Sequence, residues 1–352
     1  MAATLRILQL GGGSMGTRRI RDLAGRQGIE VRLFDARADR RRTAEARFGI
    51  RTFDSFEAAA DWQPEAVVIS TPPGTKGPLV EWALDRGVHH FVEADIWSYG
   101  VSDRVAGADG LVCAPSLTFH FLPVVKALVK FVPAGIGELL SYQFLLAGEM
   151  ATWHPTEGAE YYGRHRDTAP AREMVPFELA WLAELFGPAK SVAGEFGRFS
   201  QRSDSFEDTW SLQMQQERGG TGQLTVTMAC PQDIRRGSAC GVKGLATWDI
   251  NRGEIILSVG SVTPQIHQCG ELSSVIEATY AAEINAFVDA ILNGSPWPHR
   301  YDDYQLGLAT LAAAEASALT HQWTEIDPGR EPDRVLALPP QHSRAALGGA
   351  SR

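Results

Sequence analysis

A glycine-rich turn between an expected strand and an expected helix constrains this chain more than any other feature. The apolar run 5–10 leads into Gly11-Gly-Gly-Ser-Met-Gly16, and an amphipathic stretch follows. In a G-x-G-x-x-G turn, Gly11 makes the tight turn, Gly13 lets the backbone approach a pyrophosphate, and Gly16 lets helix and strand pack closely. Asp35 ends the second expected strand nineteen residues after Gly16, where a carboxylate can accept hydrogen bonds from an adenosine ribose. These features predict a dinucleotide site; the alternative is a glycine turn that binds nothing.

The charges after the second strand leave two cofactors open. Asp35 favours NAD, because a carboxylate there repels the 2′-phosphate of NADP. Arg37, Arg40 and Arg41 argue for NADP, because a guanidinium can bind that phosphate with two hydrogen bonds. Nine arginines lie within residues 18–42, either as solvated helix faces or as a positive rim for a phosphorylated cofactor. We expect NAD, with NADP as the alternative. The residues expected to hold the cofactor are Gly11, Gly13, Ser14, Met15, Gly16, Asp35, Arg37, Thr71, Pro72 and Glu93.

The first third of the chain alternates short β-branched runs with helical stretches, which is typical of a parallel sheet with crossover helices. The expected strands are 5–10, 31–35, 66–71, 89–93 and 110–114. The expected helices are 16–27, 39–48, 55–61 and 75–86. This pattern predicts a doubly wound α/β domain over residues 1–115.

Longer segments of alternating character follow and favour a second, α+β domain with a large, mostly antiparallel open sheet. Its expected strands are 138–147, 190–200, 210–217, 222–228 and 254–259. Its expected helices are 121–132, 176–186, 274–292 and 303–320. We expect this domain to span 116–327, and residues 328–352, which contain prolines and paired glycines without a sustained period, to form a flexible tail.

Composition narrows the partners. The net charge is −9, and the basic residues form no long stripe, so a nucleic-acid partner is disfavoured. No apolar run approaches the roughly 20 residues of a membrane helix, and the first residues lack a signal-peptide layout. We therefore expect a cytoplasmic protein. The four cysteines have no Cys-x-x-Cys spacing, so we expect reduced thiols, with neither a disulfide nor a metal site.

Several motifs resemble the glucose-fructose oxidoreductase and inositol dehydrogenase family, also called Gfo/Idh/MocA. They are the glycine turn, Val67-Val-Ile-Ser-Thr-Pro-Pro73, Ala83-Leu-Asp-Arg-Gly87, Glu93 and Tyr280-x-x-Glu283-x-x-x-Phe287. The resemblance implies a Rossmann domain, then an α/β domain whose open sheet often forms a dimer or tetramer interface. It also implies hydride transfer between nicotinamide and a carbon of a sugar, cyclitol or sugar nucleotide.

Two catalytic positions depart from the family pattern. The usual Glu-Lys-Pro reads Glu93-Ala94-Asp95, so the lysine that normally hydrogen-bonds the reacting oxygen is missing. Phe177 stands where a histidine is expected, and Lys76 stands where the family often has a histidine. The chain thus resembles a divergent subfamily that has lost the ordinary acid-base pair.

Replacements are sought in the polar and aromatic segment that precedes the expected helix 176–186. His154 is the first candidate acid-base, because imidazole titrates near neutrality; the alternative is a helix cap or packing on Trp153. Tyr161 and Tyr162 could donate the proton or serve as a stacking platform. The candidate catalytic residues are His154, Tyr161, Tyr162, Glu173 and Lys76. The candidate substrate-binding residues are Asp95, His120, Trp153 and Arg172.

For some of these residues the alternative is a purely structural role. Arg172 and Glu173 could form a structural ion pair, and His120 could be a satisfied core residue. The function predicted from the sequence is an NAD(P)-dependent oxidoreductase acting on a small, sugar-like substrate. The alternatives are an epimerase or eliminase with retained NAD, and a catalytically inactive cofactor- or sugar-sensing protein.

Overall fold

The chain folds into two compact units, seen in a computed structural model that describes residues 4–95, 100–149, 168–200 and 207–332. The first unit combines residues 1–121 with 277–303, and the second combines 122–276 with 304–352. The sequence pattern predicts a single domain boundary at residue 115 instead. The difference arises because Ile284, Phe287 and Val288 pack into the core of the first unit.

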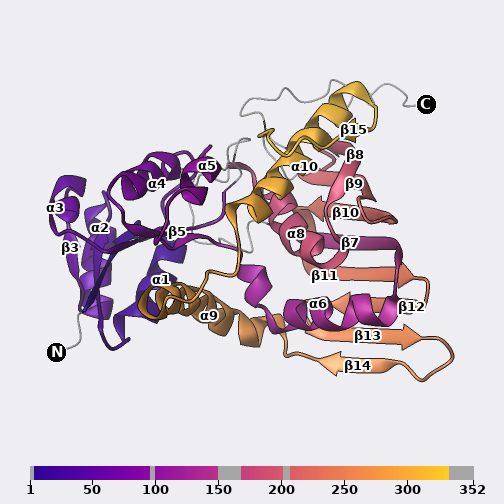
Figure 1. Cartoon of the computed structure of the whole chain (residues 1–352), viewed down its shortest axis with the longest axis horizontal. Helices are drawn as coiled ribbons and strands as arrows, with labels where there is room; N and C mark the ends of the chain where they lie inside the picture. Colours follow the sequence, from indigo (N-terminus) through magenta and orange to yellow (C-terminus); the bar gives the residue numbers. More distant parts are fainter. Residues whose placement is uncertain (1–3, 96–99, 150–167, 201–206, 333–352) are drawn as a thin grey trace, which may run out of the picture. The chain divides into compact units, whose positions relative to one another are not determined.

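The first unit contains a six-stranded sheet whose order is β3-β2-β1-β4-β5-β6 and whose strand pairs are all parallel (Figure 1). Its strands are β1 (Leu5–Leu10), β2 (Ile29–Phe34), β3 (Arg51–Phe53), β4 (Ala66–Ile69), β5 (His89–Val92) and β6 (Cys113–Pro115). Its first helices are α1 (Ser14–Ala24), α2 (Ala38–Phe48), α3 (Phe56–Asp61), α4 (Lys76–Asp85) and α5 (Ser102–Ala106). This order reverses beside β1, as in doubly wound nucleotide-binding domains, and confirms the predicted fold class.

Two apolar cores lie on the two faces of this sheet. On one face, Ile7 and Val68 pack with α1, α2 and α9 (Leu272–Asn293). On the other face, Leu8 and Val67 pack with α3 and α4. Strands buried on both faces need apolar residues at successive positions, which is why β1 and β4 are almost continuously apolar. The helices therefore fix the strand ends from both sides.

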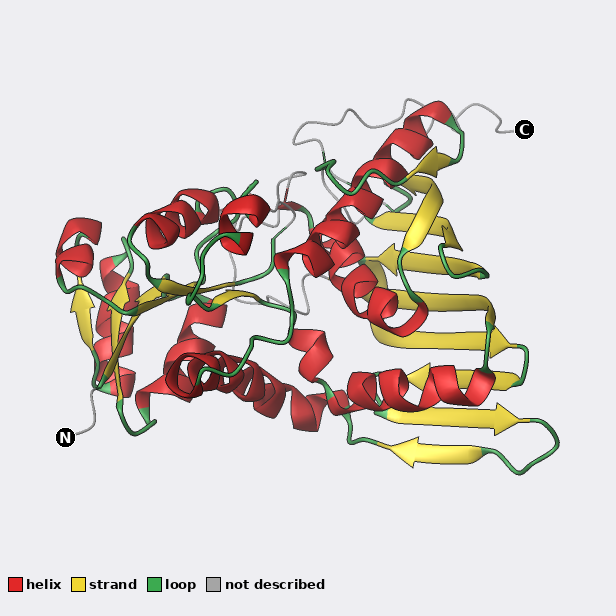
Figure 2. Cartoon of the chain, viewed as in Figure 1, coloured by secondary structure: helices red, strands yellow, loops and turns green. Residues whose placement is uncertain are grey.

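The second unit is built on a nine-stranded sheet in the order β14-β13-β12-β11-β7-β10-β9-β8-β15 (labelled in Figure 1; its strands are yellow in Figure 2). Its strands are β7 (Leu139–Glu149), β8 (Ala189–Gly197), β9 (Thr209–Gln216), β10 (Thr221–Thr227), β11 (Ala229–Gly241), β12 (Gly244–Asp249), β13 (Glu254–Val259), β14 (Gln265–Gln268) and β15 (Thr324–Glu325). Strands β7 and β10 pair in parallel, and the other described pairs are antiparallel. The mostly antiparallel open sheet is thus confirmed.

Described helices cover one face of this sheet, and the side chains on the opposite face of β9 are exposed. Helix α6 (Pro123–Ile136) packs on β12 and β13, while α8 (Pro170–Phe186) packs on β9 and β10. Along β9, side chains alternate between the buried Trp210, Leu212 and Met214 and exposed serine and glutamine. Helix α10 (Tyr301–Thr320) also belongs largely to this unit.

Sequence patterns missed several elements for physical reasons. Strand β3 is a three-residue edge strand, too short to display a period. Strand β11 contains Gly237, where a Cβ would lie 2.2 Å from the Trp248 ring, so a strand interior carries a residue that usually marks a loop. Helix α8 begins at Pro170, and Pro176 lies inside it rather than at its start. None of the described helices is long and apolar enough to cross a membrane.

Candidate functional site

The candidate site lies at the carboxyl edge of the parallel sheet, where the strand order reverses beside β1. The turns that leave β1, β2, β4 and β5 all begin at this edge. In doubly wound sheets the crevice at such a reversal is where ligands bind. The sequence-predicted residues Asp35, Thr71, Pro72, Glu93 and Asp95 follow these strand ends directly.

The glycine turn has the shape that its sequence predicts. Gly11 has φ +90°, and a Cβ there would lie 2.5 Å from the Ser70 carbonyl oxygen. A Cβ on Gly16 would lie 1.9 Å from the Gly11 carbonyl oxygen. At Gly13 a Cβ would meet no clash, because its nearest neighbours are atoms of the Arg40 guanidinium at 3.7–3.9 Å, an ordinary van der Waals distance. Gly11 and Gly16 are therefore steric requirements of the fold, whereas Gly13, which forms the cradle before α1, is not.

Helix α1 begins at this cradle with an unneutralised positive end. Gly13 is its N-cap, no side chain caps it, and no acid lies in its first turn. Backbone N–H groups at a helix N-terminus attract anions. The backbone N–H groups of Ser14 and Met15 are the first of these groups. The Ser14 side chain has a separate contact, because its hydroxyl accepts a hydrogen bond from Arg18 at 2.7 Å. The cradle and the helix end together fit the pyrophosphate of a dinucleotide.

Asp35 sits at the end of β2 and ties the glycine turn to the start of α2. One carboxylate oxygen accepts a hydrogen bond from the Gly12 N–H at 2.7 Å, and the other accepts one from the Arg37 N–H at 2.8 Å. The residue is 6% exposed. The Arg37 guanidinium pairs with Asp39, and this hydrogen bonding lowers the pKa of Asp39 to about 2.

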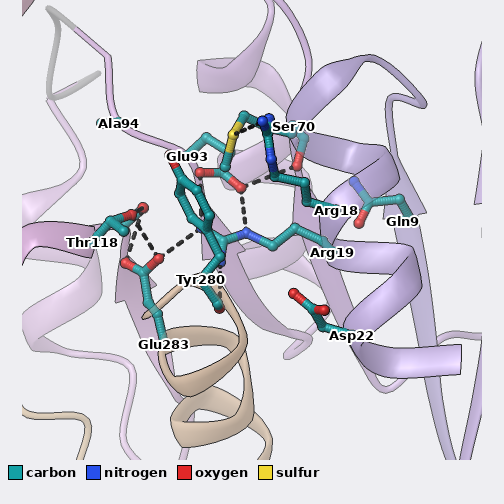
Figure 3. Close-up of polar contacts among 12 residues, drawn as sticks. Gln9, Arg18, Arg19, Asp22, Ser70, Glu93, Ala94, Thr118, Tyr280 and Glu283 are labelled. Carbon is teal, nitrogen blue, oxygen red and sulfur yellow. Dashed lines mark hydrogen bonds and ion pairs between the residues drawn. The ribbon is translucent and has the colours of Figure 1, made fainter. Parts of the chain in front are cut away.

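Glu93, predicted to contact the cofactor, is held by a buried arginine that sequence reasoning missed. Arg19 on α1 donates from Nε and Nη2 to the two Glu93 oxygens at 2.7 and 3.1 Å (Figure 3). Its Nη2 also donates to Glu283 at 2.7 Å. The Ser70 hydroxyl donates to Glu93 at 3.4 Å. Glu93 thereby links the ends of β4 and β5 to helix α1.

Glu283 on α9 organises the chain that follows β6. Its carboxylate accepts hydrogen bonds from the Ser116 hydroxyl, the Leu117 N–H and the Thr118 hydroxyl at 2.8 to 3.0 Å. Burial raises the pKa of Glu283, and Arg19 acts in the opposite direction. Burial also lowers the pKa of Arg19, but the two carboxylates outweigh it and raise that pKa above its ordinary value. The only sequence signals were an arginine on the apolar side of α1 and the glutamate of the Tyr-x-x-Glu motif.

Lys76 and Asp95 lie close together at the turn after β5, where Ala94 replaces the lysine of the family pattern. The Lys76 ammonium donates to the carbonyl oxygens of Glu93 and Ala94 at 3.2 and 2.7 Å. It also lies 3.5 Å from an Asp95 carboxylate oxygen. Both side chains are almost fully buried. A cation thus lies against the backbone of residue 94, but it belongs to Lys76 at the start of α4.

The turn after β4 is closed by its own hydroxyl groups. The Thr75 hydroxyl donates to the Pro72 carbonyl oxygen at 2.7 Å and is paired with the Thr71 hydroxyl at 2.9 Å. Thr71 and Pro72 are at least partly accessible, as residues that contact a cofactor must be.

The remaining predicted residues lie elsewhere. Residues 150–167, which include Trp153, His154, Tyr161 and Tyr162, are outside the described part of the chain. On α8, Arg172 is buried and pairs with Glu315 at 2.7 Å, while Glu173 is half-buried. This pairing supports a structural role for Arg172. In the first unit, the buried His120 ring lies 4.4 Å from the His299 ring, centroid to centroid. No group of three possible metal-ligating side chains occurs among the described residues.

Comparison with known proteins agrees with this geometry. Residues 5–94 match the family model GFO_IDH_MocA, described as an oxidoreductase family with an NAD-binding Rossmann fold. No curated protein matches the sequence.

Solved structures share the fold over nearly the whole chain. A levoglucosan dehydrogenase in complex with NADH and levoglucosan has TM-score 0.80 and 17% identity, covering 92% of this chain and 99% of that one. A myo-inositol 2-dehydrogenase from Lactobacillus plantarum has TM-score 0.78 and 14% identity, covering 92% and 100%. GenD2 from gentamicin A biosynthesis, in complex with NAD, has TM-score 0.73 and 24% identity, covering 93% and 97%.

Proposed function

We propose that this chain, whose N-terminal domain belongs to the Gfo/Idh/MocA oxidoreductase family, is an NAD(P)-dependent dehydrogenase of a polyhydroxylated substrate. The substrate class is a sugar, cyclitol or sugar nucleotide whose hydroxyl-bearing carbon exchanges a hydride. The observation that carries the proposal is the start of α1 at Gly13, which has no side-chain cap and no acid in its first turn, beside Asp35. Neighbours named for levoglucosan and myo-inositol support the substrate class.

The chain's own residues have distinct proposed tasks at the cofactor. The N–H groups at the start of α1 bind the pyrophosphate, and Asp35 orients the adenosine ribose. When bound, the nicotinamide accepts or delivers the hydride. Arg19 and Glu93 hold the ends of β4 and β5 in place, so Glu93 is a positioning residue in this scheme.

A separate group must take the proton of the substrate hydroxyl. Lys76 is a weak candidate, because its ammonium already donates to two carbonyl oxygens and pairs with Asp95. We therefore assign proton transfer to His154, with Tyr161 and Tyr162 as substitutes, since imidazole exchanges protons near neutral pH. Trp153, Glu173 and His120 are proposed substrate contacts.

The open face of the nine-stranded sheet supports a further part of the proposal, a homodimer or homotetramer. Polar side chains such as Gln213 and Gln215 alternate outward along β9, and Leu140 and Leu145 are exposed on β7. A broad, flat sheet face of mixed polarity can pair with a second copy of itself. Sedimentation velocity tests this part independently of activity.

The experiment for the proposed function compares two glycine variants of the full chain. Gly13→Val fills the cradle, whereas Gly25→Val adds a side chain at the other end of α1, where a Cβ would meet nothing within 4 Å. Calorimetry should show NAD⁺ binding by the wild type and by Gly25→Val but not by Gly13→Val. Equal affinity in both variants would refute the cofactor site.

Activity is then measured by NADH absorbance across a panel of polyols and sugar nucleotides. His154→Ala should lower turnover by roughly 10² to 10⁴-fold, the usual contribution of general acid-base catalysis, while leaving the NAD⁺ dissociation constant unchanged. NAD⁺ binding without turnover on any substrate would favour the sensor alternative. Product formation without net NADH release would favour the epimerase alternative.

A further inference from the structure

A cavity of about 480 Å³ lies at the edge of the parallel sheet opposite to the proposed dinucleotide site. It is lined by His89, the first residue of β5, and by Cys113, the first residue of β6. Glu93, at the proposed dinucleotide site, follows the other end of β5. Because parallel strands all begin at one edge of a sheet and end at the other, the cavity and the dinucleotide site lie at opposite ends of β5. The cavity is therefore a separate feature of the first unit.

Apolar side chains from four segments line this cavity. They come from α5, from the turn before β6, from the end of α9 and from the chain that follows α9; the larger ones are Val105, Leu111, Val112, Ile291, Pro296 and Trp297. Strand β6 is the last strand of its sheet, so these side chains gather where no further strand covers the edge. The volume and the apolar lining are both typical of sites that bind small molecules.

His89 supplies one hydrogen-bond donor whose identity is fixed by the backbone. Its Nδ1 accepts a hydrogen bond from the Val112 N–H at 2.9 Å, so this nitrogen carries no proton. Burial lowers the pKa of His89, so the neutral ring that prevails at neutral pH carries its proton on Nε2. Nε2 has no hydrogen-bond partner among the residues that the structure describes. A donor is therefore left for a ligand in the cavity.

The remaining polar side chains favour a ligand without charge. The Arg300 guanidinium pairs with the Asp302 carboxylate, so these two opposite charges are matched within the wall. Burial raises the pKa of the Cys113 thiol to about 11, and the Tyr301 hydroxyl is hydrogen-bonded to His90 Nε2 at 2.9 Å. A charged ligand would leave water without gaining a free counter-charge, which is costly. A neutral ligand with one hydrogen-bond acceptor matches the lining better.

We propose that this cavity is an accessory binding site for an uncharged, flat ring compound that carries a carbonyl oxygen. The apolar side chains hold the ring, with Trp297 as the aromatic wall, and the carbonyl oxygen accepts the hydrogen bond of His89 Nε2. This site is additional to the dinucleotide site and does not depend on the proposed function, because all of its lining residues lie in the first unit and none is assigned to the cofactor or substrate.

The first test titrates the full chain with 1-indanone and with indane, which has the same ring system without the carbonyl oxygen, by saturation-transfer NMR. The key variant is His89→Asn, because the asparagine oxygen can accept the Val112 N–H in place of Nδ1 while the Nε2 donor is lost. The ratio of the 1-indanone affinity to the indane affinity should fall at least threefold in His89→Asn, the loss expected for one hydrogen bond. An unchanged ratio would overturn the assigned role of His89.

A second pair of variants tests the cavity itself. Ala106→Trp adds a large side chain at an exposed position of the lining, whereas Ala46→Trp is the matched control at an exposed position on α2 outside the cavity. Ala106→Trp should weaken both compounds at least tenfold, and Ala46→Trp should change neither more than twofold. An equal effect of the two variants, no binding by the wild type, or displacement of 1-indanone by NAD⁺ would refute the accessory site. Absence of NAD⁺ binding would instead refute the proposed function and leave this site intact.

Discussion

Replacing Arg19 with methionine should destabilise the first unit far more than the same change at Arg18, one residue earlier on α1. Arg19 is fully buried and pairs with both Glu93 and Glu283. Methionine keeps much of the apolar stem but leaves two carboxylates without their cation. Removing one partner of a buried ion pair typically costs about 3 to 5 kcal/mol. For a unit of this size that corresponds to a fall in melting temperature of roughly 6 to 20 °C.

Arg18→Met is the matched control. Arg18 pairs with Glu277 at 3.3 Å, and the two side chains are 35% and 48% exposed. Exposed ion pairs contribute about 0 to 1 kcal/mol. Hydrogen exchange of the β1 and β5 amides in urea is the suitable assay, because it reports on the first unit alone.

The pH dependence gives the prediction a second, independent readout. Burial already raises the pKa of Glu283 against the influence of Arg19, so losing Arg19 raises it further. The folded variant then binds a proton that the unfolded chain releases, and its stability must increase as pH falls. The deficit of Arg19→Met relative to wild type should shrink between pH 8 and pH 5. Equal destabilisation by the two arginine variants, or a deficit independent of pH, would refute the electrostatic account.

Three further predictions concern single residues of the first unit. Burial lowers the pKa of His90 to about 4. Below pH 6.5 the unfolded chain therefore binds more protons than the folded chain, so the stability decreases as the pH is lowered. His90→Gln should remove about 3 kcal/mol of that loss at pH 4, measured by urea titration. Gly16→Ala places a Cβ 1.9 Å from the Gly11 carbonyl oxygen, so NAD⁺ affinity should fall and the free energy of unfolding, measured by urea titration, should fall by about 1 to 3 kcal/mol. Burial raises the pKa of Cys113 to about 11, so iodoacetamide should label it at least tenfold more slowly than the exposed Cys240, as read by peptide mass spectrometry.

The sequence carried the parts of the site that depend on neighbours along the chain. The glycine turn needs only β1 before it and α1 after it, and Asp35 needs only the end of β2, so local patterns were sufficient. Arg19 behaves differently, because its partners Glu93 and Glu283 lie 74 and 264 residues away. A periodic pattern assigns a charged residue to a solvent face unless its partner is known. Long-range ion pairs are therefore what a single sequence conceals.

The same distinction explains the missing lysine at position 94. Sequence comparison by motif finds Ala94 and concludes that a cation is absent, yet the Lys76 ammonium lies 2.7 Å from the Ala94 carbonyl oxygen. The Lys76 ammonium donates hydrogen bonds to the carbonyl oxygens of Glu93 and Ala94 and pairs with Asp95. The charge is retained, but its hydrogen-bonding capacity is directed into the protein. Lys76 therefore stabilises the turn after β5 and is not available to donate a proton to a substrate. For this reason we propose that the acid-base group is His154.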